Sequence, residues 1–153
     1  MSPSPNDPIL LCYDRSDGAR RAIQTAGELF PGRKAVVLHV WSPISVAVAA
    51  YGAALPAYDD SELEGAALQV AEEGAEVARA AGLDATAEIA ESTYEGTWHA
   101  ILTVTRSRGA ALLVLGARGL STFTSLLLGS VSHGVAQHAH VPVLIVPPPM
   151  RGE

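Results

Sequence analysis

The sequence predicts an α/β protein built on a doubly wound, five-stranded parallel sheet, and three observations support this. Segments that suit strands alternate along the chain with amphipathic segments that suit helices. Three strand candidates, 9–13, 35–40 and 111–115, are unbroken apolar runs, which is typical of strands covered on both faces. The other two are weaker: 85–89 alternates apolar and polar residues, and 141–146 contains a proline, so both suit sheet edges. The strand order 3-2-1-4-5 places these two at the edges.

Each connecting segment has helical features. Ser16 can cap the first helix, which Pro31-Gly32 ends. Residues 61–64 match a capping box for the second helix, and Gly82 stands just past its end. Two further helices are expected before and after the fourth strand. The residues expected to face the core are Ala19, Ala22, Ile23, Ala26, Leu29 and Phe30 in the first helix, Leu63, Ala66, Ala67, Val70, Val77 and Ala78 in the second, Trp98, Ile101, Leu102 and Thr105 in the third, and Val131, Val135 and His138 in the fourth.

Length and composition indicate one globular domain. The chain has 153 residues, of which 48% are hydrophobic and 17% charged. We expect a disordered lead at 1–8, a domain at 9–147 and a tail at 148–153. A net charge of −6 argues against nucleic acid as a partner, because binding to phosphate backbones needs a basic surface. The longest uncharged stretch, 41–58, is interrupted by prolines and glycine, and residues 1–8 do not resemble a secretory signal, so we expect a cytoplasmic protein that does not span a membrane.

A glycine-punctuated loop after the fourth strand is the strongest functional signal. Gly116 and Gly119 follow the strand, and Gly129-Ser130 precede the last helix after a nine-residue gap. Glycines allow an anion to approach the backbone, and a helix N-terminus offers free N–H groups and a positive dipole end. Ser130 is expected to be the N-cap. The loop therefore suits a phosphate, although glycines that serve only as turn residues would give the same spacing.

The predicted strand order brings the end of the first strand beside this loop. Asp14 ends the first strand, and Val40 ends the second strand next to it. Ligands bind at the carboxyl ends of strands where the strand order reverses. A carboxylate would repel a phosphate, so Asp14 suits a ribose hydroxyl or an exocyclic amine, while the backbone of Val40 suits a base edge. The alternative is that Asp14 caps the following helix.

These motifs resemble the ATP-binding branch of the universal stress protein family over about 9–146. The branch has glycine, two residues, glycine, nine residues, and then glycine with serine or threonine, which is the spacing of Gly116, Gly119, Gly129 and Ser130. The resemblance implies a Rossmann-like fold of the adenine nucleotide alpha hydrolase-like type, and it implies that adenine, ribose and phosphates are contacted by the residues above. It also implies a homodimer. The expected nucleotide-binding residues are Asp14, Val40, Gly116, Arg118, Gly119, Gly129, Ser130, Val131 and Ser132.

Two features depart from the family pattern. Tyr13 and Arg15 flank Asp14 where the family often has smaller residues, so the adenine end could be altered. The loop 120–128 contains no Lys or Arg, which leaves Arg15 and Arg118 as the nearby cations and makes backbone amides the main phosphate ligands.

The favoured function is a non-enzymatic switch that binds ATP, with or without Mg²⁺, and reports stress or energy state to an unknown protein partner. Phosphoryl transfer needs more positive charge than this loop supplies. The alternatives are a slow ATPase or phosphotransferase with Asp14 or His133 as base, and a binder of AMP or a cyclic nucleotide.

Two segments suggest contacts outside the nucleotide site. Strand 141–146 is apolar on both faces and carries no charge, so we expect a homodimer through this edge strand. The segment 42–60 is long for a connection and apolar at several positions, which suits a flexible lid or a partner surface. His133, His138 and His140 do not share a helix face, and no metal site is expected.

Overall fold

A computed structural model describes residues 2–52, 59–118 and 128–149 of the chain. Its sheet has five parallel strands in the order β3-β2-β1-β4-β5, as the sequence predicts. The strands are β1 (Ile9–Cys12), β2 (Lys34–Trp41), β3 (Asp84–Glu91), β4 (Leu112–Gly116) and β5 (Val143–Val146). Each connection between strands that are consecutive in the sequence contains a helix, as crossovers between parallel strands commonly do.

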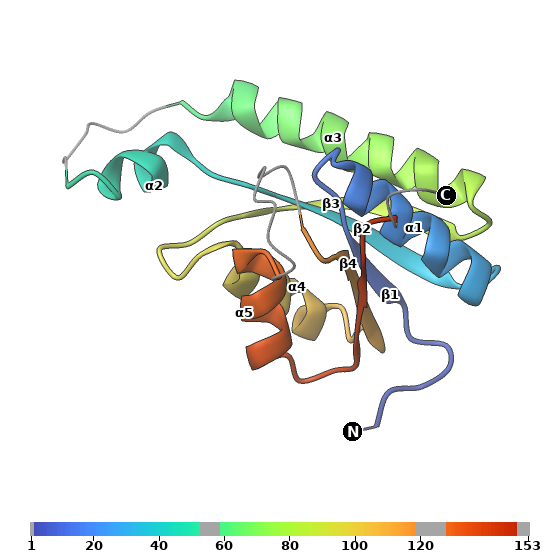
Figure 1. Ribbon diagram of the computed structural model, residues 1–153. Coiled ribbons are helices and arrows are strands. Elements are labelled where there is room, and N and C mark those ends of the chain that lie inside the picture. The colour runs from blue at the N-terminus through green and yellow to red at the C-terminus, as the bar shows by residue number, and fades with distance from the viewer. Residues whose placement is uncertain (1, 53–58, 119–127, 150–153) are drawn as a thin grey trace.

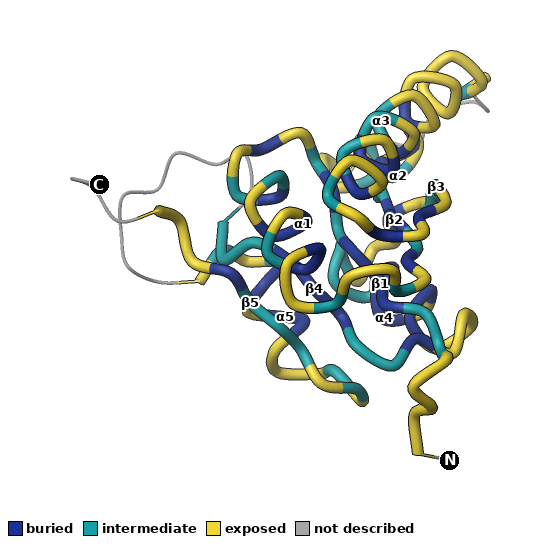
Figure 2. Tube along the Cα trace, turned by 90° about the vertical axis from the view of Figure 1, so that its right-hand side faces the viewer, coloured by how far each residue is buried: buried dark blue, intermediate teal, exposed yellow. Residues whose placement is uncertain are grey.

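Helices cover both faces of the sheet (Figure 1). The helices α1 (Asp17–Leu29) and α3 (Ser61–Ala80) lie on one face, and α4 (Thr97–Ser107) and α5 (Ser130–His138) lie on the other. Each face has its own apolar cluster, the first containing Leu11, Tyr13 and Val37, the second containing Leu10, Leu38 and Leu113. Figure 2 shows the buried strands between helices whose outer surfaces are exposed. Consecutive strand residues therefore point to opposite layers, and this alternation decides what each residue at the end of β1 contacts.

The predicted cap of α1 is confirmed, and the predicted capping box of α3 is wrong. Ser16 is the N-cap of α1, and its hydroxyl accepts a hydrogen bond from the Ala19 N–H at 3.1 Å. In α3 the N-cap is Asp60, so Ser61 is already the first helical residue. Asp60 Oδ1 instead accepts a hydrogen bond from the Ile44 N–H at 3.2 Å, which ties the start of α2 (Ile44–Ala49) to the start of α3.

The core-facing side of α3 differs from the prediction because it consists of small residues. Ala67, Ala71, Gly74, Ala75 and Ala78 are buried. Leu63 and Ala66, which were expected to be inside, are exposed, because they line an open hollow of about 370 Å³ between the start of α3 and the end of β2. Small residues let α3 lie close to the sheet, and its buried stripe begins only at Ala67.

Four further expectations are corrected near helix and strand ends. Leu29, in the last turn of α1, is 57% exposed. His138 is also exposed: its ring stacks on the Trp98 ring, with the two ring centroids 4.5 Å apart, instead of entering the core. The N-cap of α5 is Gly129, so Ser130 is the first helical residue. Pro142 precedes β5 and its carbonyl accepts the Leu113 N–H, so the strand itself contains no proline.

The segments outside the domain core have defined structure where they are described. In the lead before β1, the Asp7 N–H donates to the Ser4 carbonyl, and Arg33 donates hydrogen bonds to the carbonyls of both residues. In the segment 42–60, α2 is a short helix without buried residues, while 53–58 lie outside the described residues. None of the described helices has the length and hydropathy needed to cross a membrane.

Candidate functional site

A cavity of about 280 Å³ lies at the carboxyl ends of β1 and β4, where the strand order reverses. Its floor is apolar and comes from strands β1, β2 and β4 and from α4. Its rim comes from the loops after β1 and β4 and from the first turns of α1, α4 and α5. The described residues that line it are Cys12, Tyr13, Asp14, Ser16, Ala19, Leu38, His39, Val40, Thr97, Ile101, Leu115, Gly116, Arg118, Gly129, Ser130, Val131 and Ser132.

The N-terminus of α5 forms one end of the cavity. Gly129 is held in place because its N–H donates to the Ala117 carbonyl at 2.9 Å. The Ser132 hydroxyl lies 2.7 Å from the same carbonyl and 3.0 Å from the Gly129 carbonyl, so it braces the first turn from inside. The first turn contains no acidic residue. The first N–H groups of a helix have no acceptor within the helix, so this end of the cavity is suited to an anion.

The glycines of the loop have different roles. A Cβ at Gly116 would lie 2.9 Å from the backbone of Gly18, and a Cβ at Gly18 would lie 2.7 Å from the Arg118 carbonyl. Gly116 and Gly18 therefore allow the β4 loop to pack on the first turn of α1, which is a packing role that the spacing did not reveal. A Cβ at Gly129 would make only ordinary contacts, at 3.5 Å or more. Packing therefore does not require glycine at this position, which is the N-cap of α5.

Asp14 lines the cavity from the loop after β1, whereas the α5 amides line it from the segment after β4. Its Oδ1 accepts a hydrogen bond from the Ser16 N–H at 3.0 Å, so Asp14 forms a turn just before α1 and Ser16, not Asp14, caps the helix. Among the described residues, Oδ2 has no hydrogen-bond partner. The carboxylate is only partly buried. One oxygen is therefore used to orient the side chain, and the other can accept a hydrogen bond from a ligand.

The backbone of Val40 faces the gap beyond the end of β1. The Tyr13 N–H donates to the Leu38 carbonyl, which shows that Leu38 directs its backbone groups toward β1. Backbone direction alternates along a strand, so the N–H and C=O of Val40 point to the same side, where β1 has already ended. An adjacent donor and acceptor on an open strand edge match the ring nitrogen and exocyclic amine of adenine.

His39, the residue before Val40, contacts the backbone at the end of β1. Its Nδ1 lies 2.9 Å from the Tyr13 carbonyl. Because a carbonyl can only accept a hydrogen bond, Nδ1 carries the proton. The histidine is only partly buried, and its partner is a backbone group at the rim of the cavity, so it is not a residue of the closed core.

The cations of the site are arranged differently from the expectation. Arg118 lines the cavity, but Arg15 does not, because its Nε donates to Glu73 of α3 at 2.8 Å. The Tyr13 hydroxyl donates to the same carboxylate at 2.6 Å. The Tyr13 hydroxyl and the Arg15 side chain are thus held on the α3 side of the sheet, although Tyr13 also borders the cavity.

These contacts shift the pKa values of Tyr13 and Glu73, and burial shifts that of Cys12. Burial and the hydrogen bond to Glu73 raise the pKa of Tyr13 to about 12. The hydrogen bonds from Tyr13 and Arg15 lower the pKa of Glu73 to about 2. Burial, with a smaller effect of the Asp14 charge, raises the pKa of the Cys12 thiol to about 12, so this residue of the cavity floor is a neutral apolar group rather than a nucleophile.

Comparison with known proteins identifies the family. The universal stress protein family matches residues 5–147. The chain is 30% identical over 146 residues to the universal stress protein YxiE of Bacillus subtilis, covering 90% of this chain and 97% of that protein. It is 34% identical over 143 residues to a universal stress protein of Thermus aquaticus, covering 90% and 96%. The chain belongs to the universal stress protein family.

Solved structures of universal stress proteins share this fold. One, described as in complex with cAMP, is 24% identical and has a TM-score of 0.68, with 94% of this chain and 98% of that chain covered. Another, from Arabidopsis thaliana and described as having AMP bound, is 16% identical with a TM-score of 0.62, covering 95% and 94%. At these identities the likeness supports the Rossmann-like fold of this universal stress protein and not its ligand.

The structure brings most of the expected site residues together. Eight of them line the cavity: Asp14, Val40, Gly116, Arg118, Gly129, Ser130, Val131 and Ser132. Gly119 lies outside the described residues. Sequence reasoning did not name the residues of the apolar floor, which include Leu38, Ile101 and Leu115, because the same apolar pattern that marks a core residue also marks a cavity wall. It also missed Thr97, whose place at the start of α4 depends on how α4 packs. The role of these residues in ligand binding stays a prediction.

Proposed function

We propose that this universal stress protein binds an adenine nucleotide in the cavity between β1 and β4 and acts as a nucleotide-dependent regulatory module. The observation that carries the proposal is the polarity of the cavity. Asp14 and Val40 contribute a carboxylate and an open strand edge from β1 and β2, and the N-terminus of α5, which has no side-chain cap, lines the same cavity from the segment after β4. A base and ribose suit the first two groups, and phosphates suit the helix N-terminus.

ATP is the ligand that we propose first, with AMP and a cyclic nucleotide as the alternatives. Solved universal stress proteins described with cAMP and with AMP support the nucleotide class. Among the described lining residues Asp14 is the only carboxylate, and we assign it to the base and ribose. A Mg²⁺ ion that enters with ATP would therefore be held by phosphate oxygens and water rather than by a protein carboxylate.

The same geometry favours binding over catalysis. Phosphoryl transfer needs several positive groups around the transferred phosphate and a base that positions the nucleophile. Arg118 is the only Lys or Arg in the described part of the lining, and His133, the other candidate base, is exposed and does not line the cavity. We propose that any hydrolysis of ATP is incidental to its function.

We propose further that the protein works in the cytoplasm as a homodimer that reports nucleotide occupancy to a protein partner. In β5 the carbonyls of Pro142 and Val146 accept hydrogen bonds from the β4 side, so the backbone groups of Val143 and Ile145 point outward from the sheet. This strand is an edge without charged side chains. Antiparallel pairing with the same strand of a second copy would satisfy those groups.

Calorimetric titration tests the ligand and the site together. We expect ATP to bind the wild-type protein and to show no measurable binding to Gly129→Val, because a branched side chain would occupy the space in front of the α5 amides. The chain tolerates a Cβ at this position, so the variant should fold. Gly65→Val is the matched control, since Gly65 lies on α3 with open space around its Cα. Equal affinity of both variants for ATP, AMP and cAMP would refute the site.

A further inference from the structure

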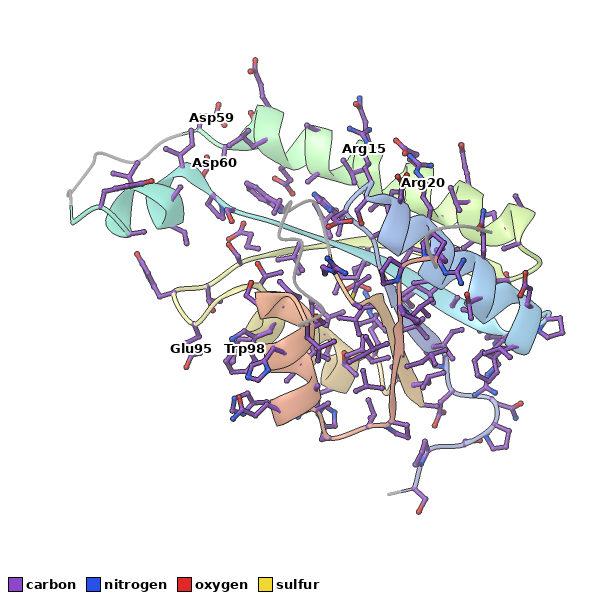
Figure 3. The ribbon with its side chains drawn as sticks, in the orientation of Figure 1. Arg15, Arg20, Asp59, Asp60, Glu95 and Trp98 are labelled. Atoms are coloured by element: carbon purple, nitrogen blue, oxygen red, sulfur yellow. The ribbon has the colours of Figure 1, made fainter. Side chains whose placement is uncertain are left out.

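Glu73 of α3 holds both sequence neighbours of Asp14. Its Oε1 accepts hydrogen bonds from the Tyr13 hydroxyl at 2.6 Å and from Arg20 Nη2 at 2.7 Å, and its Oε2 accepts one from Arg15 Nε at 2.8 Å. Arg20 also lies over the Tyr13 ring, with its guanidinium carbon 5.6 Å from the ring centre. Figure 3 shows Arg15 and Arg20 beside α3, near the start of α1. One carboxylate therefore joins the end of β1 and the first turn of α1 to α3.

The backbone between these contacts is strained. Arg15 has a φ of +67°, and it is the only residue other than glycine with a positive φ in the described ranges 2–52, 59–118 and 128–149. A side chain in this left-handed region is unfavourable unless surrounding contacts impose it. Here the contact is the ion pair with Glu73. The reversal at Arg15 lets the chain leave β1 and enter α1 within four residues.

The alternation along β1 explains why this affects the ligand site. Tyr13 borders the cavity but belongs to the apolar cluster under α1 and α3, whereas Cys12 lines the cavity and packs on the opposite face. Asp14 follows Tyr13 and points to the cavity side. With Tyr13 and Arg15 both fixed on the α3 side, the side chain between them is directed to the cavity.

We propose that Glu73 is a positioning residue for nucleotide binding, which fixes Asp14 toward the base and ribose by holding Tyr13 and Arg15 on the other face of the sheet. Glu73 itself does not touch the ligand. The inference rests on the proposed function, and it adds a requirement outside the cavity, on a helix that contributes no residue to the lining.

A second role for Glu73 would give a different result. If the carboxylate only neutralised Arg15, its removal would free a guanidinium near the site and strengthen the binding of phosphates. Adenosine, which has no phosphate, separates these two roles. A positioning role predicts weaker binding of adenosine and ATP alike, whereas a neutralising role predicts tighter ATP and unchanged adenosine.

The first experiment compares Glu73→Gln with Glu72→Gln in the full chain by calorimetry with adenosine and with ATP. Glutamine keeps the size of the side chain but offers one acceptor oxygen where Glu73 uses two. Glu72 is the matched control, because it makes the same charge change on the next residue of α3 and has only a long contact of 3.9 Å with Arg79. We expect both ligands to bind Glu73→Gln roughly 2- to 30-fold more weakly than they bind the wild type, which is the range for residues that act through a network of contacts. Both ligands should bind Glu72→Gln with the affinity of the wild type.

The second measurement reads the position of Asp14 without a ligand. The Ser16 N–H is hydrogen-bonded to Asp14 Oδ1, so its hydrogen exchange reports whether the carboxylate keeps its place. We expect faster exchange at Ser16 in Glu73→Gln and an unchanged rate in the β1 core at Leu11. Adding Arg15→Gly to Glu73→Gln should restore adenosine binding, because glycine adopts a positive φ without an anchor.

The outcomes separate the inference from the function on which it rests. Unchanged adenosine affinity in Glu73→Gln, or tighter ATP binding alone, would overturn the positioning role. If the wild-type protein binds no adenine compound, the proposed function fails, and the exchange rate at Ser16 alone then decides whether Glu73 holds Asp14. Equal exchange rates at Ser16 in the two variants would overturn the inference in that case as well.

Discussion

Substitution of Gly74 by alanine tests how tightly α3 packs on the sheet. A Cβ at this position would lie 2.6 Å from Tyr13 Cδ1 and 2.8 Å from Val37 Cγ1, closer than carbon atoms approach in proteins. Neither neighbour can yield easily. Val37 is fully buried in β2, and Tyr13 is 2% exposed, with its hydroxyl held by Glu73. Either α3 must move away from the sheet or the Tyr13 contact must change.

The expected magnitude follows from two opposing effects. Replacing glycine by alanine inside a helix stabilises it by about 1 kcal/mol. Forcing a methyl group into a filled core costs about 1–3 kcal/mol. Gly65→Ala, on the same helix, gives only the first effect, because nothing lies within 4 Å of its Cβ position. The difference between the two variants cancels helix propensity and leaves the packing cost, which we expect to be about 1–3 kcal/mol.

Urea and thermal unfolding measure this difference. Gly65→Ala should be more stable than the wild type, and Gly74→Ala should be less stable than Gly65→Ala. For a chain of this size each kcal/mol shifts Tm by about 2–4 °C, so the two variants should differ by roughly 2–12 °C. If the free energy of unfolding depends equally on urea concentration in both variants, the two expose the same surface on unfolding and differ in stability alone. Identical Tm values for Gly65→Ala and Gly74→Ala would refute the close packing of α3 on Tyr13 and Val37.

Three further predictions concern catalysis, assembly and pH. We expect single-turnover assays to show no rapid hydrolysis of ATP by the wild-type protein. Asp14→Asn removes the charge that a general base needs, so rapid hydrolysis that this substitution abolishes would favour the enzyme alternative. Ile145→Pro removes an outward N–H of β5 and should give monomers in light scattering, whereas Ile145→Val should not; a monomeric wild type at micromolar concentration would refute the dimer. The pKa of Glu73 is lowered to about 2, so its contribution to stability is present above about pH 4.5 and lost as the pH falls through 2. Between pH 5 and 2, the free energy of unfolding in urea should therefore fall less for Glu73→Gln than for the wild type. An equal fall for the two proteins would contradict the lowered pKa of Glu73.

The sequence by itself determines the fold and the location of the cavity. Unbroken apolar runs mark the central strands, and the alternating run and the run near a proline mark the edges, so the order of the sheet follows from local patterns. The strand order then places Asp14 beside the loop at Gly116, because parallel strands direct their carboxyl ends to one side. The cap at Ser16 is also a local property, and it too was predictable.

The sequence does not determine where a helix begins when two adjacent residues can both serve as its N-cap. At α3 the pattern favoured Ser61, but Asp60 took the position, and at α5 Gly129 took the place expected for Ser130. Helix entry depends on how the preceding loop is held. At α5 the Gly129 N–H is bonded to Ala117, a residue of another segment.

Only the tertiary structure decided what Tyr13, Arg15 and Gly116 do. Glu73 lies 60 and 58 residues from the two side chains that it binds, and nothing in either local sequence indicates the pairing. The sequence pattern predicts that Gly116 is a phosphate-loop glycine. In the structure a side chain at this position would collide with the backbone of Gly18 in α1. These contacts join segments that become neighbours only when helices α1 and α3 pack on the same face of the sheet. Hydrophobic periodicity records which face a residue prefers, and it carries no information about which residue of another element will meet it there.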